Sequence, residues 1–231
     1  MFAERSLKLE RIDTGDYTPD EYDRFLHDIR LVNRFAGDRR ALEKTLLREI
    51  EKENPQKISV LDVGAGSGEL LREIGKFARR KKKEAKLFGL ELNARSADAI
   101  LEESKGFAEI KSIQANALGL PFPDKTFDYV VSSLFTHHLT DDEIIKTLRE
   151  MKRVVRRKIF VIDLYRHPLA YFFYKIFCVA FRISPLVRHD GSLSILRSFK
   201  PDELAELAGK AGWENISVRK IFPFRLVLSG C

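Results

Sequence analysis

The segment Val60-Leu61-Asp62-Val63-Gly64-Ala65-Gly66-Ser67-Gly68 joins an apolar run to the start of an amphipathic one. The apolar run is typical of a buried strand, and the spacing after it is typical of a helix that begins near Ser67. Glycine adopts positive φ readily and carries no Cβ, so the turn between them can bring bare backbone against a ligand. The free N–H groups of the helix start would face the same place. We therefore predict a site for a polar or anionic ligand, although three glycines alone fit several nucleotide-binding classes.

Strands and helices are predicted to alternate along the chain around this turn. Strands are expected at 58–63, 86–91, 110–114, 127–133 and 157–163, and helices at 70–78, 94–105 and 141–153. Continuous apolar strands separated by amphipathic helices are typical of a parallel sheet covered on both faces. The segments 214–218 and 222–228 are separated by a short loop, so they are expected to form an antiparallel hairpin. The predicted fold class is α/β.

The length of 231 residues suits one domain with a full core, and we expect a single domain over 1–231. Its expected parts are an N-terminal cap of two helices broken near Gly37 (1–54), a ligand-binding core (55–163), a substrate-side insertion (164–200), and the last helix with the hairpin (201–231). Within the insertion, a helix over 168–181 is expected to precede an irregular stretch over 182–200. The last helix is expected to start at Pro201 and to end at Gly212.

The net charge of +7 raises the question of a nucleic-acid or membrane partner. The richest basic runs, Arg79 to Lys83 and Lys152 to Lys158, each precede a predicted strand. They would therefore lie at the amino-terminal edge of the sheet, whereas ligands of open α/β sheets bind beyond the carboxyl ends of the strands. The N-terminal residues lack the apolar run of a signal peptide, and Cys178 and Cys231 are too few for a disulfide framework. We expect a cytoplasmic protein.

This order of elements resembles the class I S-adenosylmethionine-dependent methyltransferases over roughly residues 40–228. Val60 to Gly68 is similar to that family's first motif, in which glycine backbone meets the methionine part of the cofactor. Glu91, at the end of the next strand, resembles the acidic residue that accepts hydrogen bonds from the ribose hydroxyls. Gln114 to Ala117, followed by Leu120 to Asp128, is similar to the segment that packs the adenine. The resemblance implies S-adenosylmethionine as the cofactor and a Rossmann-like sheet of seven strands, one of them antiparallel.

The resemblance also implies which residues meet the cofactor. They are Asp62, Gly64, Ala65, Gly66, Gly68, Glu91, Leu92, Asn116, Ala117 and Ser132. The family commonly has aspartate where this chain has Asn116, which still offers a carbonyl acceptor, so the departure bears on affinity. From the residues alone, Asp62 is expected to order the glycine loop by accepting backbone N–H bonds. A nicotinamide dinucleotide is the alternative ligand, but Glu69 stands where G-x-G-x-x-G requires a small residue.

Methyl transfer to a neutral acceptor needs a base, and two histidines are well placed to supply one. The fourth strand is followed by Leu134-Phe135-Thr136-His137-His138-Leu139. These side chains are therefore expected to project from the edge of the sheet at which the ligand binds. Strand alternation does not decide between them because the turn resets the direction; we favour His138 over His137 as the catalytic residue. In the insertion, substrate contacts are expected from His167, Tyr171, Arg188 and His189, the last beside Asp190. Neither H-x-x-x-H nor C-x-x-C spacing occurs, so no metal is predicted.

The segment 168–181 is apolar on nearly every face but too short to span a bilayer, which takes about 20 residues. It is a helix buried against the domain and its N-terminal cap, the wall of an apolar pocket, or a surface that makes peripheral contact with a membrane. We predict O- or C-methylation of a small hydrophobic or aromatic acceptor, and the resemblance is to members of the ubiquinone and menaquinone biosynthesis type. An anionic head group would meet arginines around this helix. They are Arg166, Arg182, Arg188 and Arg197.

Two alternatives stay open at this point. The first is an RNA or DNA methyltransferase, which is disfavoured because Ser132-Ser133-Leu134-Phe135 replaces the Asn/Asp-Pro-Pro-aromatic sequence that grips a flipped base. Cys178 and Cys231 are also poorly placed for a nucleophile acting on cytosine. The second is a scaffold or partner subunit that binds the cofactor without catalysis, for which the changed position at Asn116 is the favouring feature. The sequence leaves the oligomeric state open.

Overall fold

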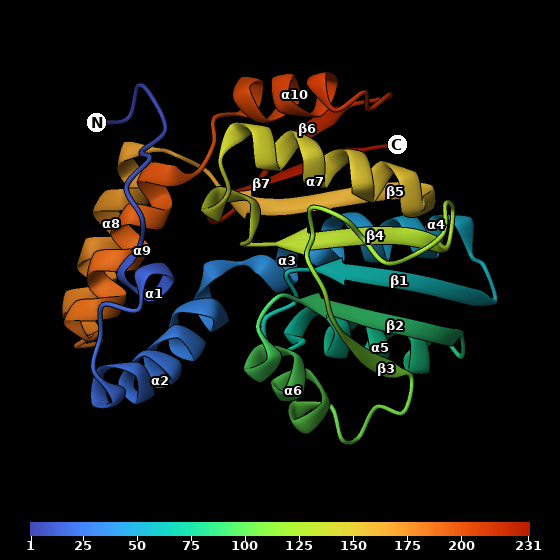
Figure 1. Ribbon diagram of the computed structural model, residues 1–231, viewed down its shortest axis with the longest axis horizontal. Coiled ribbons are helices and arrows are strands. Elements are labelled where there is room, and N and C mark those ends of the chain that lie inside the picture. The colour runs from blue at the N-terminus through green and yellow to red at the C-terminus, as the bar shows by residue number, and fades with distance from the viewer.

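Seven strands form one sheet whose order is β3-β2-β1-β4-β5-β7-β6 (Figure 1). This computed structural model describes residues 1–231 apart from the side chains of Leu26 and Arg34. The strands are β1 (Lys57–Val63), β2 (Glu84–Glu91), β3 (Ile110–Gln114), β4 (Phe127–Ser133), β5 (Val155–Leu164), β6 (Ser217–Ile221) and β7 (Arg225–Gly230). The strand order reverses between β1 and β4, so the loops after these two strands separate and leave a crevice at their carboxyl ends.

The sheet is parallel except for β7, which runs antiparallel to both β5 and β6. This confirms the predicted Rossmann-like sheet and its C-terminal hairpin. The two hairpin strands begin three residues later than expected. Phe222-Pro223-Phe224 forms the turn instead of starting the last strand, because proline has no N–H to donate to a ladder.

Helices cover both faces of the sheet, as predicted. On one face, α7 (Asp141–Val154) and α10 (Pro201–Lys210) pack on Leu61, Val63 and the apolar residues of β5 and β7. On the other face, α5 (Glu69–Arg80) and α6 (Ala94–Glu103) share a core cluster with Ile58 and Val60, and α6 lies over β2 and β3. Successive β1 side chains thus point to opposite faces, which is why this strand carries apolar residues on both of them.

The N-terminal cap contains more helical segments than the two expected. They are α1 (Arg11–Thr14), α2 (Pro19–Ala36), α3 (Asp38–Leu42), a π-helical turn (Glu43–Leu47) and α4 (Arg48–Glu53). Thr18 and Glu21 form a capping box at the start of α2, and Gly37, with φ of 91°, breaks the chain between α2 and α3 as predicted. Residues 1–10 form no regular element and run beside α9 (Pro185–Arg197), where the Ser6 N–H donates to the Leu196 carbonyl.

Most of the insertion is helical, which corrects the expectation of an irregular stretch over 182–200. It forms α8 (Pro168–Ala180) and α9 (Pro185–Arg197). Helix α9 buries polar and apolar residues on every face, so its sequence lacks the 3.6-residue apolar period that would predict a helix. Helices α1, α2, α8 and α9 stand together beside the carboxyl ends of β1, β4 and β5 (Figure 1). In the part of the chain that the structure describes, no helix is long and apolar enough to cross a membrane.

Candidate active site

The turn after β1 holds three glycines in the left-handed region. Gly64, Gly66 and Gly68 have φ of 73°, 57° and 79°. A Cβ on Gly64 would lie 2.5 Å from the Phe135 ring, whereas one on Gly66 would meet no described atom within 4 Å. Gly64 is therefore required by packing, and Gly66 leaves bare backbone open to the crevice.

Two carboxyl groups flank this turn. Glu91, at the end of β2, accepts a hydrogen bond from the Gly66 N–H. Burial raises the pKa of Glu91, and this backbone bond acts in the opposite direction. Asp62 is almost fully buried, and its Oδ1 has no hydrogen-bond partner among the described residues. Burial, followed by the negative charge of Glu91, raises the pKa of Asp62 to about 8. The expected role of Asp62 in ordering the loop stays a prediction, since this oxygen accepts no loop N–H.

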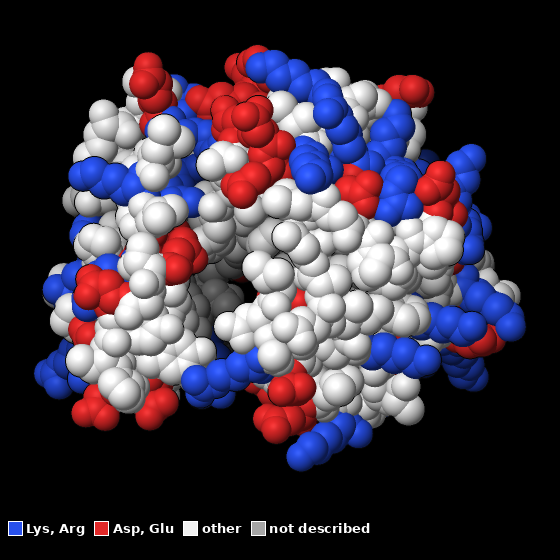
Figure 2. Space-filling view, viewed as in Figure 1, with Lys and Arg blue, Asp and Glu red and all other residues white. Residues whose placement is uncertain are grey.

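A cavity of about 1130 Å³ opens between the glycine turn and the helical layer. Figure 2 shows the surface hollowed where this layer meets the sheet. One wall is apolar and comes from α2, α8 and the β6–β7 turn, with Phe35, Phe173, Phe177 and Phe222 among its residues. A polar part of the lining contains Glu10, His137 and His138. A smaller cavity of about 440 Å³ lies at the amino-terminal edge of the sheet, away from the glycine turn.

His137 is buried in a single 3₁₀ turn (Thr136–His138) that follows β4. Its Nδ1 lies 2.7 Å from Oδ1 of Asp163 on β5. Asp163 is fully buried and accepts further hydrogen bonds from the Thr136 hydroxyl and from the His137 and Leu164 N–H groups. Burial alone would raise the pKa of Asp163, but the His137 ring and these bonds lower it to about 2. Asp163 is thus a carboxylate at neutral pH and orients the imidazole.

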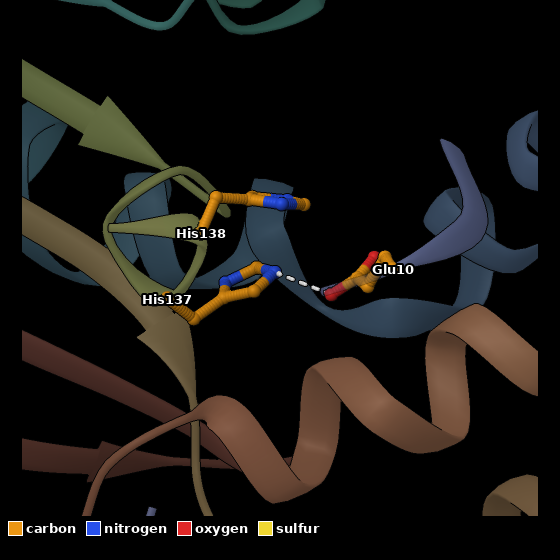
Figure 3. A group of neighbouring side chains, drawn as sticks. All are labelled: Glu10, His137 and His138. Atoms are coloured by element: carbon orange, nitrogen blue, oxygen red, sulfur yellow. Dashed lines mark ion pairs between the residues drawn. The ribbon is translucent and has the colours of Figure 1, made fainter. Parts of the chain in front are cut away.

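His138 is paired with a second carboxylate, since its Nδ1 lies 3.1 Å from Oδ2 of Asp13. Burial lowers the pKa of His138, but the bond to Asp13 and the charges of Glu10 and Asp13 raise it overall. Glu10 lies 4.0 Å from Nε2 of His137 and accepts a bond from the Ser194 hydroxyl at 2.8 Å (Figure 3). Burial raises the pKa of Glu10.

Sequence reasoning missed Glu10 and Asp13. They lie in and next to a four-residue helix with no periodic pattern, more than 120 positions from the histidines. The backbone carbonyls of Lys8, His137 and His138 accept hydrogen bonds from the buried Arg197, which joins the N-terminal segment to the 3₁₀ turn. No local feature of the sequence predicts that Arg197 joins these two distant segments.

Comparisons with known proteins identify the chemistry. The methyltransferase domain family matches residues 60–158. The ubiquinone/menaquinone biosynthesis C-methyltransferase UbiE of Cronobacter sakazakii is 32% identical over 174 residues, which cover 68% of this chain and 67% of that protein. The chain belongs to the class I S-adenosylmethionine-dependent methyltransferases. It is an enzyme that uses S-adenosylmethionine to methylate a small molecule, as predicted.

Other relatives of the methyltransferase agree with this assignment. The protein of the same name from Hahella chejuensis is 36% identical over 102 residues, and this alignment spans only 39% of that protein. Among solved structures, magnesium protoporphyrin IX methyltransferase from Synechocystis, with bound SAH, superimposes with a TM-score of 0.65 at 12% identity, over 96% of this chain and 99% of that one. A SAM-dependent methyltransferase from Aquifex aeolicus superimposes with a TM-score of 0.57 at 17% identity, over 80% of this chain and 88% of that one. These two show the shared fold.

The cofactor residues expected for the methyltransferase fall into two groups. Asp62, Gly64, Ala65, Gly66 and Glu91 line the cavity, whereas Gly68, Leu92, Asn116, Ala117 and Ser132 do not. The buried Ser132 hydroxyl donates to the Val63 carbonyl and joins two strands. Asn116 Oδ1 accepts from the Leu118 N–H, which fixes its amide in a turn. The open backbone at Gly66 and the unpaired buried oxygen of Asp62 fit a ligand with hydrogen-bond donors and acceptors.

The four expected substrate residues lie outside the lining of the cavity in the methyltransferase. His167 caps α8 by accepting from the Leu169 N–H, and Tyr171 packs edge-on against Phe2. Arg188 donates to the Ile183 carbonyl. His189 does pair with Asp190, at 2.8 Å, but its side chain is 55% exposed. Their sequence neighbours line the cavity instead. These are Ala170, Phe173, Tyr174, Val187, Asp190 and Gly191.

Two arginines expected near an anionic head group have structural roles in the methyltransferase. Arg166 is buried, pairs with Glu203 and donates to the carbonyls of Phe2 and Ala3. Arg197 is buried among backbone carbonyls, as described above. Each guanidinium already has the hydrogen-bond or ion-pair partners that a buried cation requires. The expectation that these two side chains would bind an anionic head group is therefore wrong.

Proposed function

We propose that the methyltransferase acts on a small aromatic or otherwise apolar acceptor that carries one ionisable O–H or C–H group. The observation that carries this proposal is the cavity itself, in which a phenylalanine-rich wall is combined with the imidazoles of His137 and His138. An acceptor with one apolar body and one reactive polar group matches such a lining. The relatives named for ubiquinone and menaquinone biosynthesis support a quinol-like acceptor.

The cofactor would be held at the other side of the cavity by Gly66, Glu91 and Asp62. When bound, S-adenosylmethionine supplies an electrophilic methyl group. Glu91 would accept hydrogen bonds from hydroxyl groups, and the unpaired Asp62 oxygen would accept from a cationic or N–H donor. The bare Gly66 backbone allows close approach.

His137 is the proposed proton acceptor, in preference to His138, which the sequence favoured. Asp163 accepts a hydrogen bond from Nδ1–H, so a neutral imidazole carries its lone pair on Nε2, which lies 4.0 Å from Glu10 at the polar end of the cavity. A carboxylate in this position holds the tautomer and stabilises the imidazolium that forms. Burial of His137 keeps bulk water from competing for the proton.

Turnover of defined acceptors tests this proposal. S-adenosylhomocysteine release would be measured with phenols and quinols that carry alkyl chains of increasing length, and with matched small polar alcohols. We expect kcat/KM to rise with apolar surface, and His137→Asn to lower kcat about 10²-fold or more with every accepted substrate. A preference for small polar acceptors would contradict the proposal.

Peripheral contact with a membrane is part of the same proposal. An apolar face of exposed side chains borders the cavity mouth. It consists of Phe35, Phe172, Phe173, Ile176, Val179, Phe181 and Phe222. Phe35, Phe173 and Phe222 also line the cavity, so a lipid-like acceptor would pass from this face to the site. Residues 165–189 contain no Asp or Glu, which favours an anionic lipid surface.

Sedimentation with anionic vesicles tests the membrane contact. Phe172→Glu combined with Val179→Glu should abolish binding to vesicles, while Leu101→Glu on α6, which is also exposed, should leave it unchanged. Equal vesicle binding by the unmodified protein, the double variant and the Leu101→Glu control would contradict the proposed membrane contact. The rest of the proposal would not be affected.

A further inference from the structure

Two imidazoles and a carboxylate meet at the polar end of the cavity. Glu10, His137 and His138 each offer one ligand atom, and the three atoms lie within 4.8 Å of one another. Figure 3 shows both rings extending from the 3₁₀ turn after β4 toward Glu10, which comes from the N-terminal segment. Glu10 and His137 are almost fully buried.

Each imidazole is anchored by its own aspartate. Nδ1 of His137 faces Asp163 at 2.7 Å, and Nδ1 of His138 faces Asp13 at 3.1 Å. A neutral imidazole that donates from Nδ1 leaves Nε2 unprotonated, and this carboxylate–histidine arrangement is the usual support of a metal ligand. The polar end therefore has both ligands and the groups that orient them.

The charges around the two rings also suit a cation. Three carboxylates approach them, from Glu10, Asp13 and Asp163. Arg197 is 4.0 Å from Glu10, and Arg5 is paired with Asp141. The carboxylates thus outnumber the cations that the structure places at the cluster. A divalent ion would compensate the excess, since opposite charges attract strongly in a buried setting.

We propose that Glu10, His137 and His138 bind one divalent transition-metal ion of the Zn²⁺ or Co²⁺ type. Two imidazoles and a carboxylate select such ions over Mg²⁺ and Ca²⁺, which prefer oxygen ligands. Ligand atoms of a tetrahedral site at about 2.0–2.1 Å from the metal lie about 3.4 Å apart, so the cluster, whose ligand atoms lie within 4.8 Å of one another, must close by up to about 1.4 Å. The Glu10 carboxylate, which accepts from the Ser194 hydroxyl at 2.8 Å, would have to shift toward the two rings to supply that closure.

Metal binding has a consequence that rests on the proposed function. The ion takes the Nε2 lone pair by which His137 would accept the acceptor's proton. A bound ion therefore inhibits methyl transfer, and removal of the ion restores it. The metal site itself does not depend on this consequence.

Binding is tested on the chelator-treated full-length protein with Co²⁺, followed by visible absorption, and with Zn²⁺, followed by calorimetry. We expect one ion per chain, with affinity at least tenfold weaker in Glu10→Gln and in His138→Asn. The matched control is His27→Asn, which removes an exposed histidine that also lies beside an aspartate, Asp28 at 3.2 Å. It should bind as the unmodified protein does. Circular dichroism checks that each variant is folded.

Absence of stoichiometric binding, or unchanged binding in both cluster variants, overturns the site. Turnover with an accepted substrate is then measured at increasing Zn²⁺ and after chelation. If Zn²⁺ binding saturates over the same concentrations at which turnover falls, the predicted inhibition through His137 is supported. Saturation with unchanged turnover overturns that consequence while the site stands. Failure of every acceptor in metal-free enzyme, with binding intact, counts against the proposed function alone.

Discussion

Nδ1 of His137 lies 2.7 Å from Oδ1 of Asp163, and both side chains are buried. Replacing Asp163 by Asn removes the charge that holds the Nδ1 proton, so the ring is free to carry its proton on Nε2. We expect Asp163→Asn to lower kcat by about 10²- to 10⁴-fold with a small change in the acceptor KM. Steady-state kinetics with an accepted substrate measures both constants.

The control for this change is Asp128→Asn, which alters a carboxylate at the opposite edge of the sheet, bonded to Ser59. It should retain kcat within a few fold. Equal losses in the two variants would indicate general destabilisation and remove the assigned role of Asp163.

The pKa of Asp62 predicts how the stability of the cofactor-free protein changes with pH. Burial raises it from its ordinary value of 3.8 to about 8, so between these values the folded state keeps a proton that the unfolded state has lost. Stability is therefore highest below about pH 4 for this group and falls as pH rises toward 8, by up to about 1.4 kcal/mol per pH unit.

Asp62→Asn removes this titration. The difference in free energy of unfolding between variant and unmodified protein, measured with urea, should shift in favour of the variant from pH 6 to pH 8. A difference that is the same at both pH values would show that Asp62 is already ionised at pH 6. Affinity for S-adenosylmethionine, measured in parallel, should fall because Asn cannot ionise to pair with the cationic cofactor when it binds.

The two glycines of the turn are predicted to differ in what they support. A Cβ at Gly64 collides with Phe135, whereas at Gly66 it meets open space. Gly64→Ala combines positive-φ strain with overpacking and should lower the free energy of unfolding by about 2–4 kcal/mol. Gly66→Ala carries the strain alone, about 1–2 kcal/mol, but should weaken cofactor binding because its methyl group occupies the opening. Chemical unfolding and calorimetry separate the two effects. Equal destabilisation by both would contradict the packing argument.

The fold was predictable because its core strands and helices have clear and different periods. Helix α9 was not, since burial of Asp190, Ser194 and Arg197 replaces the polar face that a surface helix would show. The pairing of His137 with Asp163 could have been predicted from the sequence, because His137 follows β4 and Asp163 lies near the end of β5, and these parallel strands end at the same edge of the sheet. Glu10 was beyond reach, because its position depends on hydrogen bonds to helix α9, not on any local pattern.

Glu91 should contribute to cofactor affinity through its charge. It is positioned at the end of β2 and already contacts the Gly66 N–H. Glu91→Gln keeps the size but loses two charge-assisted bonds, so we expect the Kd for S-adenosylmethionine to rise about 10- to 100-fold. The control is Glu109→Gln, which breaks an exposed pair with Arg79 at 2.7 Å and should leave the Kd unchanged. An unchanged Kd in Glu91→Gln would place the ribose elsewhere.

Gly191 tests the packing of α9 on α8. Alanine in place of glycine inside a helix normally stabilises a protein by about 0.5–1 kcal/mol. Here a Cβ would lie 2.1 Å from the hydroxyl oxygen of Tyr174, which donates to the Val187 carbonyl at 2.6 Å. Gly191→Ala must displace this hydroxyl and should lower the free energy of unfolding by about 1–3 kcal/mol.

Two further variants identify the cause of that loss. Gly209→Ala in α10, where a Cβ meets no described atom within 4 Å, should be stabilising. Tyr174→Phe removes the colliding oxygen, so the cost of adding Gly191→Ala should be smaller in that background than in the unmodified protein. Urea unfolding of the full double-mutant cycle gives the coupling energy. If Gly191→Ala were as stabilising as Gly209→Ala, α8 and α9 would not be packed as closely as the Tyr174 contact requires. The cavity that these two helices line would then be wider.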